Sequence, residues 1–227
     1  MISNNGRLDE LAKGSFPYLT RLSTISSADL TDEILLTFSN GKLKEFKLVN
    51  TPNVSSKGLC TFLKANVGLT KVSLICLSEA EDALIADGLG HLKRLESVCL
   101  DGSLKLGNMS VNSLASNCEC LSYLSVNGCA VDAGAIASVL KKCPKINSIS
   151  AISCNNLSSE GLLNLSGIKT KLKILNLSLV PSASPSLIKE LQNGLSTKIL
   201  SHQKQIWEAP TLLPIPEKKK KSKKSKK

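Results

Sequence analysis

The chain has 227 residues, of which 42% are hydrophobic and 21% charged, so it can bury a globular core and lacks the composition of a disordered protein. Aromatic residues make up only 3%, which indicates a core of aliphatic side chains. The first 16 residues contain no apolar stretch of signal-peptide length, and nowhere do 18 apolar residues run together. We therefore predict a soluble intracellular protein that does not enter a membrane.

The positive charge is concentrated at the C-terminus. The formal net charge is +11, but residues 218–227 hold eight lysines and leave 21 Lys and Arg against 18 Asp and Glu elsewhere, a net charge of +3. The chain outside this segment, which we call the body, is therefore nearly neutral, and the charge of the tail says little about the folded surface.

An apolar pattern, L-x-x-L-x-L, recurs along the chain. A weak copy begins at Leu19, and clear copies with spacings of 26, 26, 26, 25 and 26 residues begin at Leu43, Leu69, Leu95, Leu121, Ile146 and Leu172. So steady a period predicts a stack of similar units. We assign residues 1–18 to an N-terminal cap segment and residues 19–200 to the repeat domain.

Each unit is predicted to be a short strand followed by a helix. Ser55 and Ser158 stand where a side chain can cap the first free N–H groups of a helix, and Ser184 before Pro185 indicates another helix start. Apolar residues at helical spacing follow. One such unit cannot bury its apolar face alone, so neighbouring units must stack. The predicted fold is an α/β solenoid of about six or seven repeats, with an arc of parallel strands inside and helices outside.

The units resemble leucine-rich repeats of the cysteine-containing class, known from F-box substrate adaptors of ubiquitin ligases. The pattern is clearest in LSYLSVNGCAVDAGAIASVLKKCPK at 121–145, where Cys129 follows the strand and Cys143 closes the helix. Cys118 and Cys154 take matching places in adjoining units. The resemblance implies a curved leucine-rich-repeat solenoid that binds protein. It also implies an alternative function, the substrate-recognition subunit of a ubiquitin ligase complex.

No separate F-box, the helical module that docks such adaptors onto a ligase scaffold, is evident. The segment LTDEILLTF at 30–38 is superficially similar to its start, but Leu30 stands eleven residues after Leu19, the phase of Val54 after Leu43. The repeat therefore explains this segment. The 18 residues before the first repeat are too few for a helical docking domain.

The cysteines and histidines do not form a recognisable catalytic or metal-binding motif. Five cysteines fall between Cys118 and Cys154, but no CxxC pair or nearby histidine accompanies them. Stacked repeats would bring equivalent cysteines together as core residues about 5 Å apart. Only His91 and His202 are present, and no GxSxG, HExxH, GxGxxG or GxxxxGKS/T motif occurs. We predict no enzyme activity, no cofactor and no metal site.

The strands are predicted to present alternate residues on the concave side of the arc, where a protein partner would bind. The residues assigned to this surface are Arg21, Glu45, Lys47, Lys71, Ser97, Asp101, Tyr123, Ser125 and Asn127. The same phase includes Ser23, Val49, Ser73, Ile75, Cys99, Ser148, Ser150, Ile152, Ile174, Asn176 and Ser178. Tyr123 is the best anchor, because tyrosine is enriched among binding hot spots. In the alternative, these positions are ordinarily solvated and a partner uses the edges or loops.

The C-terminal segment changes character. Residues 201–217 contain Pro210, Pro214 and Pro216, which argue against a further repeat and for an extended connector or C-terminal cap. Residues 218–227 are too charged to fold and are a predicted disordered tail. Its lysines are Lys218, Lys219, Lys220, Lys221, Lys223, Lys224, Lys226 and Lys227. This tail is a candidate import address, a contact for nucleic acid or an acidic protein, or a solubilising segment.

These features predict a non-enzymatic scaffold for protein–protein interaction that acts as a monomer within a larger complex. The partner would bind the concave face. The basic tail would direct the protein to the nucleus or nucleolus, with the cytoplasm as the alternative location.

Overall fold

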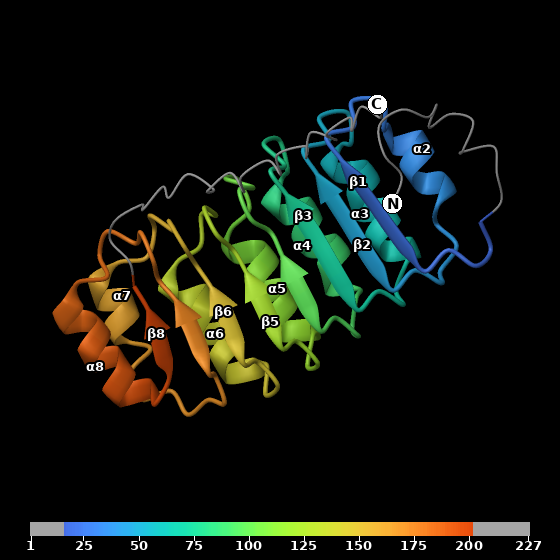
Figure 1. The fold of residues 1–227 in the computed structure, drawn as a ribbon. Coiled ribbons are helices and arrows are strands. Elements are labelled where there is room, and N and C mark those ends of the chain that lie inside the picture. The colour runs from blue at the N-terminus through green and yellow to red at the C-terminus, as the bar shows by residue number, and fades with distance from the viewer. Residues whose placement is uncertain (1–15, 202–227) are drawn as a thin grey trace, which may run out of the picture.

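The computed structural model describes residues 16–201, which form parallel strands joined by helices (Figure 1). The eight strands lie side by side in chain order. The strands are β1 Arg21–Ile25, β2 Glu45–Val49, β3 Lys71–Ile75, β4 Ser97–Cys99, β5 Tyr123–Ser125, β6 Ser148–Ser150, β7 Ile174–Asn176 and β8 Lys198–Leu200. The helices are α2 Asp32–Thr37, α3 Ser56–Ala65, α4 Asp82–Gly90, α5 Asn108–Asn117, α6 Ala133–Lys142, α7 Ser159–Leu163 and α8 Pro185–Leu195.

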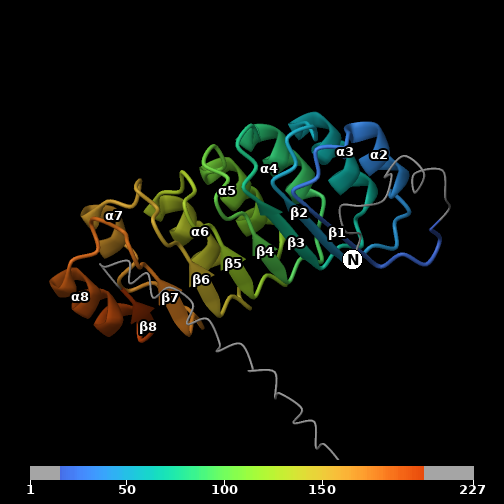
Figure 2. The ribbon, with the colours of Figure 1, turned by 45° about the horizontal axis from the view of Figure 1, so that its top comes forward.

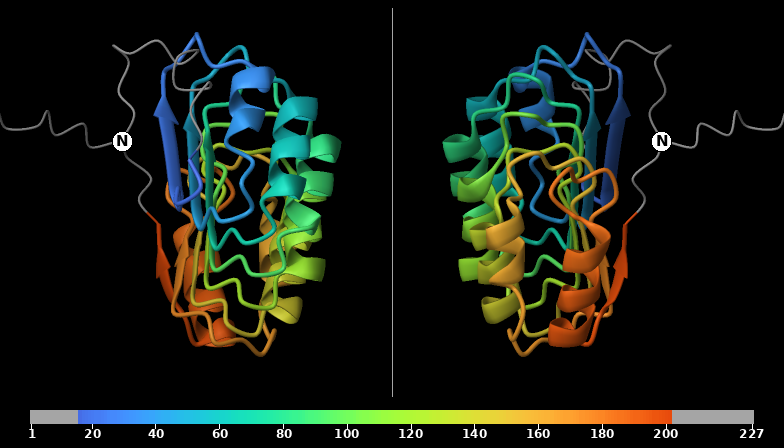
Figure 3. Two further views of the ribbon diagram at one scale, coloured as in Figure 1. Left: turned by 90° about the vertical axis from the view of Figure 1, so that its right-hand side faces the viewer. Right: turned by 90° about the vertical axis from the view of Figure 1, so that its left-hand side faces the viewer.

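This arrangement confirms the predicted leucine-rich-repeat solenoid. Helices cover one face of the sheet and leave the other face open, and the sheet does not close into a barrel (Figure 2, Figure 3). Parallel strands need a crossover connection, which the helices supply. Strands β1 to β7 each begin two residues after the apolar residue that opens a repeat, as Glu45 does after Leu43. Strand β8 lies beyond the last predicted repeat and extends the same sheet.

The core is built mainly from aliphatic side chains, as the composition predicts. The second residue of every strand is buried, and Phe46 of β2 is an example. Its ring packs against that of Phe62 from α3, with 4.6 Å between the ring centroids. Burying a side chain of this size contributes about 1.5–3 kcal/mol. A single coil, meaning one strand with the helix that follows it, cannot bury its apolar side chains without the coils on either side. The stack of coils is therefore the folding unit.

The chain leaves each of the first seven strands through a residue with a left-handed backbone. These residues occupy one position in seven successive coils and have φ between 49° and 69°: Ser26, Asn50, Cys76, Gly102, Gly128, Ser153 and Leu179. This conformation costs an ordinary L-residue about 1–2 kcal/mol, a cost that glycine avoids. Because it recurs after all of the first seven strands, the turn is a regular part of the repeat.

Cysteine side chains just after these turns link successive coils. The thiols of Cys129 and Cys154 donate to the backbone carbonyl oxygens of Leu100 and Val126, each at 3.1 Å. Both cysteines are buried. All eight cysteines of the chain lie within the described residues and are free thiols. Cys129 and Cys154 are therefore packed core residues, as the repeat predicts.

The predicted helix starts are confirmed. The Ser55 hydroxyl accepts a hydrogen bond from the Gly58 N–H, and the Ser158 hydroxyl accepts one from the Gly161 N–H, both at 3.0 Å. Ser184 caps α8 in the same way, and Pro185 is the first residue of that helix. These caps satisfy N–H groups that have no partner within the helix.

Most of the N-terminal cap segment and of the connector lies outside the described residues, as does the whole lysine tail from Lys218 to Lys227. The boundaries assigned to these segments stay predictions. Between residues 16 and 201, no helix is long and apolar enough to cross a membrane.

Candidate functional site

The open side of the sheet is the candidate binding surface, and we call it the sheet face. The helices leave this side of the sheet uncovered (Figure 3), and the strand residues that alternate with the buried ones form it. Strand register places predicted contact residues from five neighbouring strands in one row: Arg21, Glu45, Lys71, Ser97 and Tyr123. The sequence prediction thus brought together residues that lie about 26 positions apart in the chain but on adjacent strands.

A basic hollow of about 400 Å³, lined by Arg21, Glu45, Lys47 and Lys71, lies over β1, β2 and β3. Arg21 Nε lies 3.3 Å from one carboxylate oxygen of Glu45, and Lys71 Nζ lies 3.0 Å from the other. The hydrogen bond from Lys71 lowers the pKa of the Glu45 carboxyl, and the charge of Arg21 adds to this effect. Three cations and one carboxylate leave the hollow with a net charge of +2.

An apolar row lies beside the basic hollow, at the ends of β1, β2 and β3. Ile25, Val49 and Ile75 are aligned in register, and Ile25 is 50% exposed. The sequence prediction omits Ile25, although this residue has the phase of Val49. The first repeat has a weak apolar pattern, so its last strand position is not assigned. Ile25 stands six residues after Leu19, as Val49 does after Leu43, and this spacing predicts that it lies on the same face.

Tyr123 projects from small neighbours on the sheet face. Its side chain is 39% exposed, and the residues beside it in register are Ser97 and Ser148. Ile174, which is 38% exposed, continues the row on β7. A large ring flanked by two serines can enter a pocket of a partner, as interface anchors do.

Asp101, Ser125 and Asn127 form a hydrogen-bonded network. The Asp101 carboxylate accepts from the Ser125 hydroxyl at 2.7 Å and from the Asn127 backbone N–H at 3.0 Å. The Asn127 Oδ1 accepts from the Ser150 hydroxyl at 2.7 Å and from the Ile152 N–H at 2.8 Å. Ser125 is only 1% exposed, and its hydroxyl is hydrogen-bonded within this network. Ser125 therefore has almost no exposed surface that a partner could contact. This predicted contact residue does not contribute to the sheet face.

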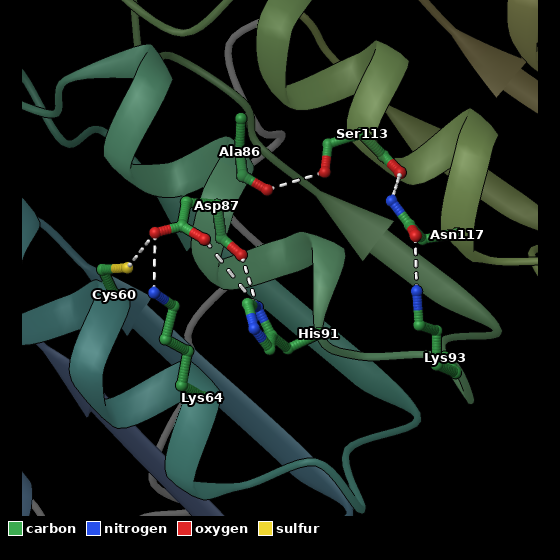
Figure 4. Close-up of polar contacts among 8 residues, drawn as sticks. All are labelled: Cys60, Lys64, Ala86, Asp87, His91, Lys93, Ser113 and Asn117. Carbon is green, nitrogen blue, oxygen red and sulfur yellow. Dashed lines mark hydrogen bonds and ion pairs between the residues drawn. The ribbon is translucent and has the colours of Figure 1, made fainter.

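On the helix side, Cys60, Lys64, Asp87 and His91 lie together between α3 and α4 (Figure 4). One Asp87 carboxylate oxygen accepts from Lys64 Nζ at 2.6 Å and from the Cys60 thiol at 3.6 Å. His91 Nδ1 lies 2.8 Å from the backbone carbonyl oxygen of Asp87. Burial, followed by the charge of Asp87, raises the pKa of the Cys60 thiol. A thiol held protonated is a poor nucleophile, so this cluster links two helices without activating the cysteine.

Other buried or half-buried thiols are also held protonated. Burial raises the pKa of Cys118 and of Cys129 to about 12 and that of Cys99 to about 11. In the part of the chain that the structure describes, no three His, Cys, Asp or Glu side chains are grouped so that they could hold a metal ion.

No family model matches the chain. Among solved structures, the chain is similar to a chain in the crystal structure of the Rad7 and Elc1 complex in yeast, with 16% identity, coverage of 89% of this chain and 76% of that chain, and a TM-score of 0.37. It is also similar to internalin C2 from Listeria monocytogenes, with 16% identity, coverage of 79% of this chain and 80% of that chain, and a TM-score of 0.48. The fold assignment rests on the strand order and repeat geometry of the chain itself.

Proposed function

We propose that the protein is a non-enzymatic scaffold for protein–protein interaction that binds another protein on its sheet face, the surface that the sequence assigns to the concave side. The observation that carries the proposal is one continuous surface with two exposed anchors, Tyr123 and Ile174, and a basic hollow. Apolar and aromatic anchors within a polar surround are the usual composition of a protein interface. A fitting partner presents apolar groups to the anchors and a carboxylate to Lys47.

The chemistry of the described thiols supports the non-enzymatic part of the proposal. Cys60 lies beside a carboxylate, and its pKa is raised, which opposes formation of the nucleophilic thiolate. The proposal includes no cofactor. The protein would act as a monomer within a larger complex.

The proposal also assigns a location. The tail from Lys218 to Lys227 would direct the protein to the nucleus or nucleolus, or hold it near nucleic acid or an acidic protein. The alternative is a cytoplasmic protein whose tail only increases solubility.

A second candidate function is substrate recognition within a ubiquitin ligase complex. Cys129 and Cys154 form the same hydrogen bond to the preceding coil. This repetition favours the second function through the resemblance to cysteine-containing repeats. In that case the sheet face would hold the substrate, and another region would contact the ligase scaffold.

Affinity purification from cells, followed by mass spectrometry, tests the proposal. The full chain is compared with the double variant Tyr123→Ala, Ile174→Ser. The control is Leu104→Ala, Met109→Ala, which removes exposed apolar side chains outside the sheet face. Truncating a hot spot costs about 2 kcal/mol or more, so the sheet-face variant should bind its main partner more than about tenfold more weakly.

The control should recover the same partner as the full chain. Equal recovery with the full chain and both variants would remove the sheet face from the proposal. Recovery of cullin-scaffold subunits with the full chain would replace the first function with the second.

A further inference from the structure

The charges of the folded body are segregated between the two edges of the sheet. The edge where strands end and helices begin carries nine carboxylates and only two lysines, Lys57 and Lys105. These carboxylates belong to Asp29, Asp32, Glu33, Glu79, Glu81, Asp82, Asp101, Asp132 and Glu160. Six lysines lie at the opposite edge, in the last turn of α6 and in the two successive connections that lead into β6 and β7: Lys141, Lys142, Lys145, Lys169, Lys171 and Lys173. We call these six residues the lysine edge.

Several of the carboxylates have a structural role. Asp82 accepts hydrogen bonds from the N–H groups of Met109 at 2.9 Å and Ser110 at 3.1 Å, in the first turn of the next helix. Asp132 accepts from the Ala135 N–H at 2.9 Å and so caps its own helix. Acidic groups at helix starts satisfy free N–H groups and the helix dipole. The fold itself therefore explains much of the acidic edge.

The fold does not explain the lysine edge in the same way. Lys141 and Lys142 lie in the last turn of α6, where the helix dipole favours a cation. Lys169, Lys171 and Lys173 follow the end of α7 by at least six residues, and the dipole effect falls off within one turn. Within residues 16–201, none of the six lysines forms an ion pair with a carboxylate.

A hollow of about 350 Å³ lies within the lysine edge. It is lined by Lys141, Lys169 and Lys171 together with Leu140, Cys143, Pro144 and Thr170. Three exposed cations around one hollow repel each other, and an anion placed among them removes that repulsion. The hollow is therefore suited to an anionic group.

We propose that the lysine edge binds the phosphate backbone of a nucleic acid. None of the large hydrophobic side chains that are exposed in the described residues lines this hollow. Protein interfaces depend on apolar anchors and are depleted in lysine, whereas lysines neutralise phosphates independently of sequence. This inference goes beyond the protein-binding proposal, because none of the residues that line the hollow of the lysine edge belongs to the sheet face. A scaffold of this kind would hold a protein and a nucleic acid at the same time.

Fluorescence anisotropy with the full chain tests this inference. The probe is a labelled mixed-sequence RNA of about 20 nucleotides, longer than the site of one small domain. The edge variant is Lys141→Gln, Lys169→Gln, Lys171→Gln. The matched control, Lys42→Gln, Lys57→Gln, Lys189→Gln, removes the same charge from exposed sites outside the lysine edge and the sheet face, and it leaves the tail intact. The melting temperatures of both variants are measured to check that they fold as the unmodified chain does.

At physiological salt, we expect the edge variant to bind the RNA about tenfold more weakly and the control to bind within about twofold of the unmodified chain. The slope of log affinity against log salt should become shallower by about 2 in the edge variant, at about 0.7 per lost phosphate contact. A parallel titration with duplex DNA shows which form is bound, because its slope changes by about 0.9 per contact.

Equal weakening in both variants would overturn the inference, because binding would then depend on total charge. A poly-glutamate peptide serves as the competing probe. Tighter binding of this peptide than of either nucleic acid, lost selectively in the edge variant, would overturn the assignment in favour of an acidic protein segment.

Discussion

Adjacent residues of β5 lie in opposite environments. Leu124 is fully buried and pairs in register with Val98 and Ile149, whereas Tyr123 lies on the sheet face with 39% of its surface exposed. The alternation of side chains along a strand produces this difference. Stability and binding are therefore carried by different residues of the same strand.

Leu124→Ala tests the inward assignment. We expect the free energy of unfolding to fall by about 2–5 kcal/mol, since the substitution loses apolar burial and leaves a cavity in a stacked core. Tyr123→Ala is the control, and it should change stability by less than about 1 kcal/mol because the ring is largely solvated. Urea denaturation of both variants measures the difference. A larger loss for Tyr123→Ala than for Leu124→Ala would contradict the register of β5.

The helices depend on their neighbours for their start points. They contain 5 to 11 residues, which is too short for an isolated helix to be stable in water. Helix α5 has Gly107 at its N-cap, which supplies no side-chain acceptor. Asp82 of α4 takes this role and accepts from two N–H groups of α5. The preceding coil thus helps to start the next helix.

Asp82→Ala should lower the free energy of unfolding by about 0.5–2 kcal/mol, the cost of losing a helix cap. Asp82→Asn should lose less, because one side-chain oxygen still accepts a hydrogen bond. Glu81→Ala is the matched control: Glu81 is exposed, stands at the N-cap of α4 and makes no side-chain cap bond. Thermal denaturation measures all three. Equal effects at residues 81 and 82 would show that capping between coils contributes nothing.

Residues 16–201 form a linear stack in which each strand pairs with the strands next to it in chain order. In the described residues, β1 and β8 are the outermost strands of the sheet, and each pairs with another strand on one side only. The stability of such a stack is approximately a sum of coil terms and interface terms. An end coil therefore opens at a lower cost than a central coil.

Native-state hydrogen exchange should show this gradient. We expect the slowest amide exchange in β4, β5 and β6 and faster exchange in β1 and β8, because an end strand separates from one neighbour and a central strand from two. Mass spectrometry of peptic fragments measures the rates. Uniform protection along all eight strands would indicate that the solenoid opens only as one cooperative unit.

Much of the fold is predictable because the repeat encodes it locally. The period of the apolar residues places β1 to β7, and Ser55, Ser158 and Ser184 mark helix starts that the structure confirms. The strand phase also brings Arg21 and Lys71 to one face beside Glu45. These features depend on side-chain spacing within one unit and on the regular stacking of units.

Other features depend on contacts between coils and required the tertiary structure. Ser125 is buried and hydrogen-bonded to Asp101, a residue of the preceding coil. Strand β8 lies within the predicted repeat domain and pairs with β7, although no copy of the L-x-x-L-x-L pattern marks it.

By itself the sequence determined a repeat solenoid, its strand phase and a body with a net charge of only +3 outside the tail. Only the tertiary structure decided where those charges lie. It places Asp82 and Asp132 at one edge of the sheet and Lys141, Lys169 and Lys171 at the other. The physical reason is that net charge is a sum over the chain, whereas an electrostatic surface depends on which residues stacking brings together in space.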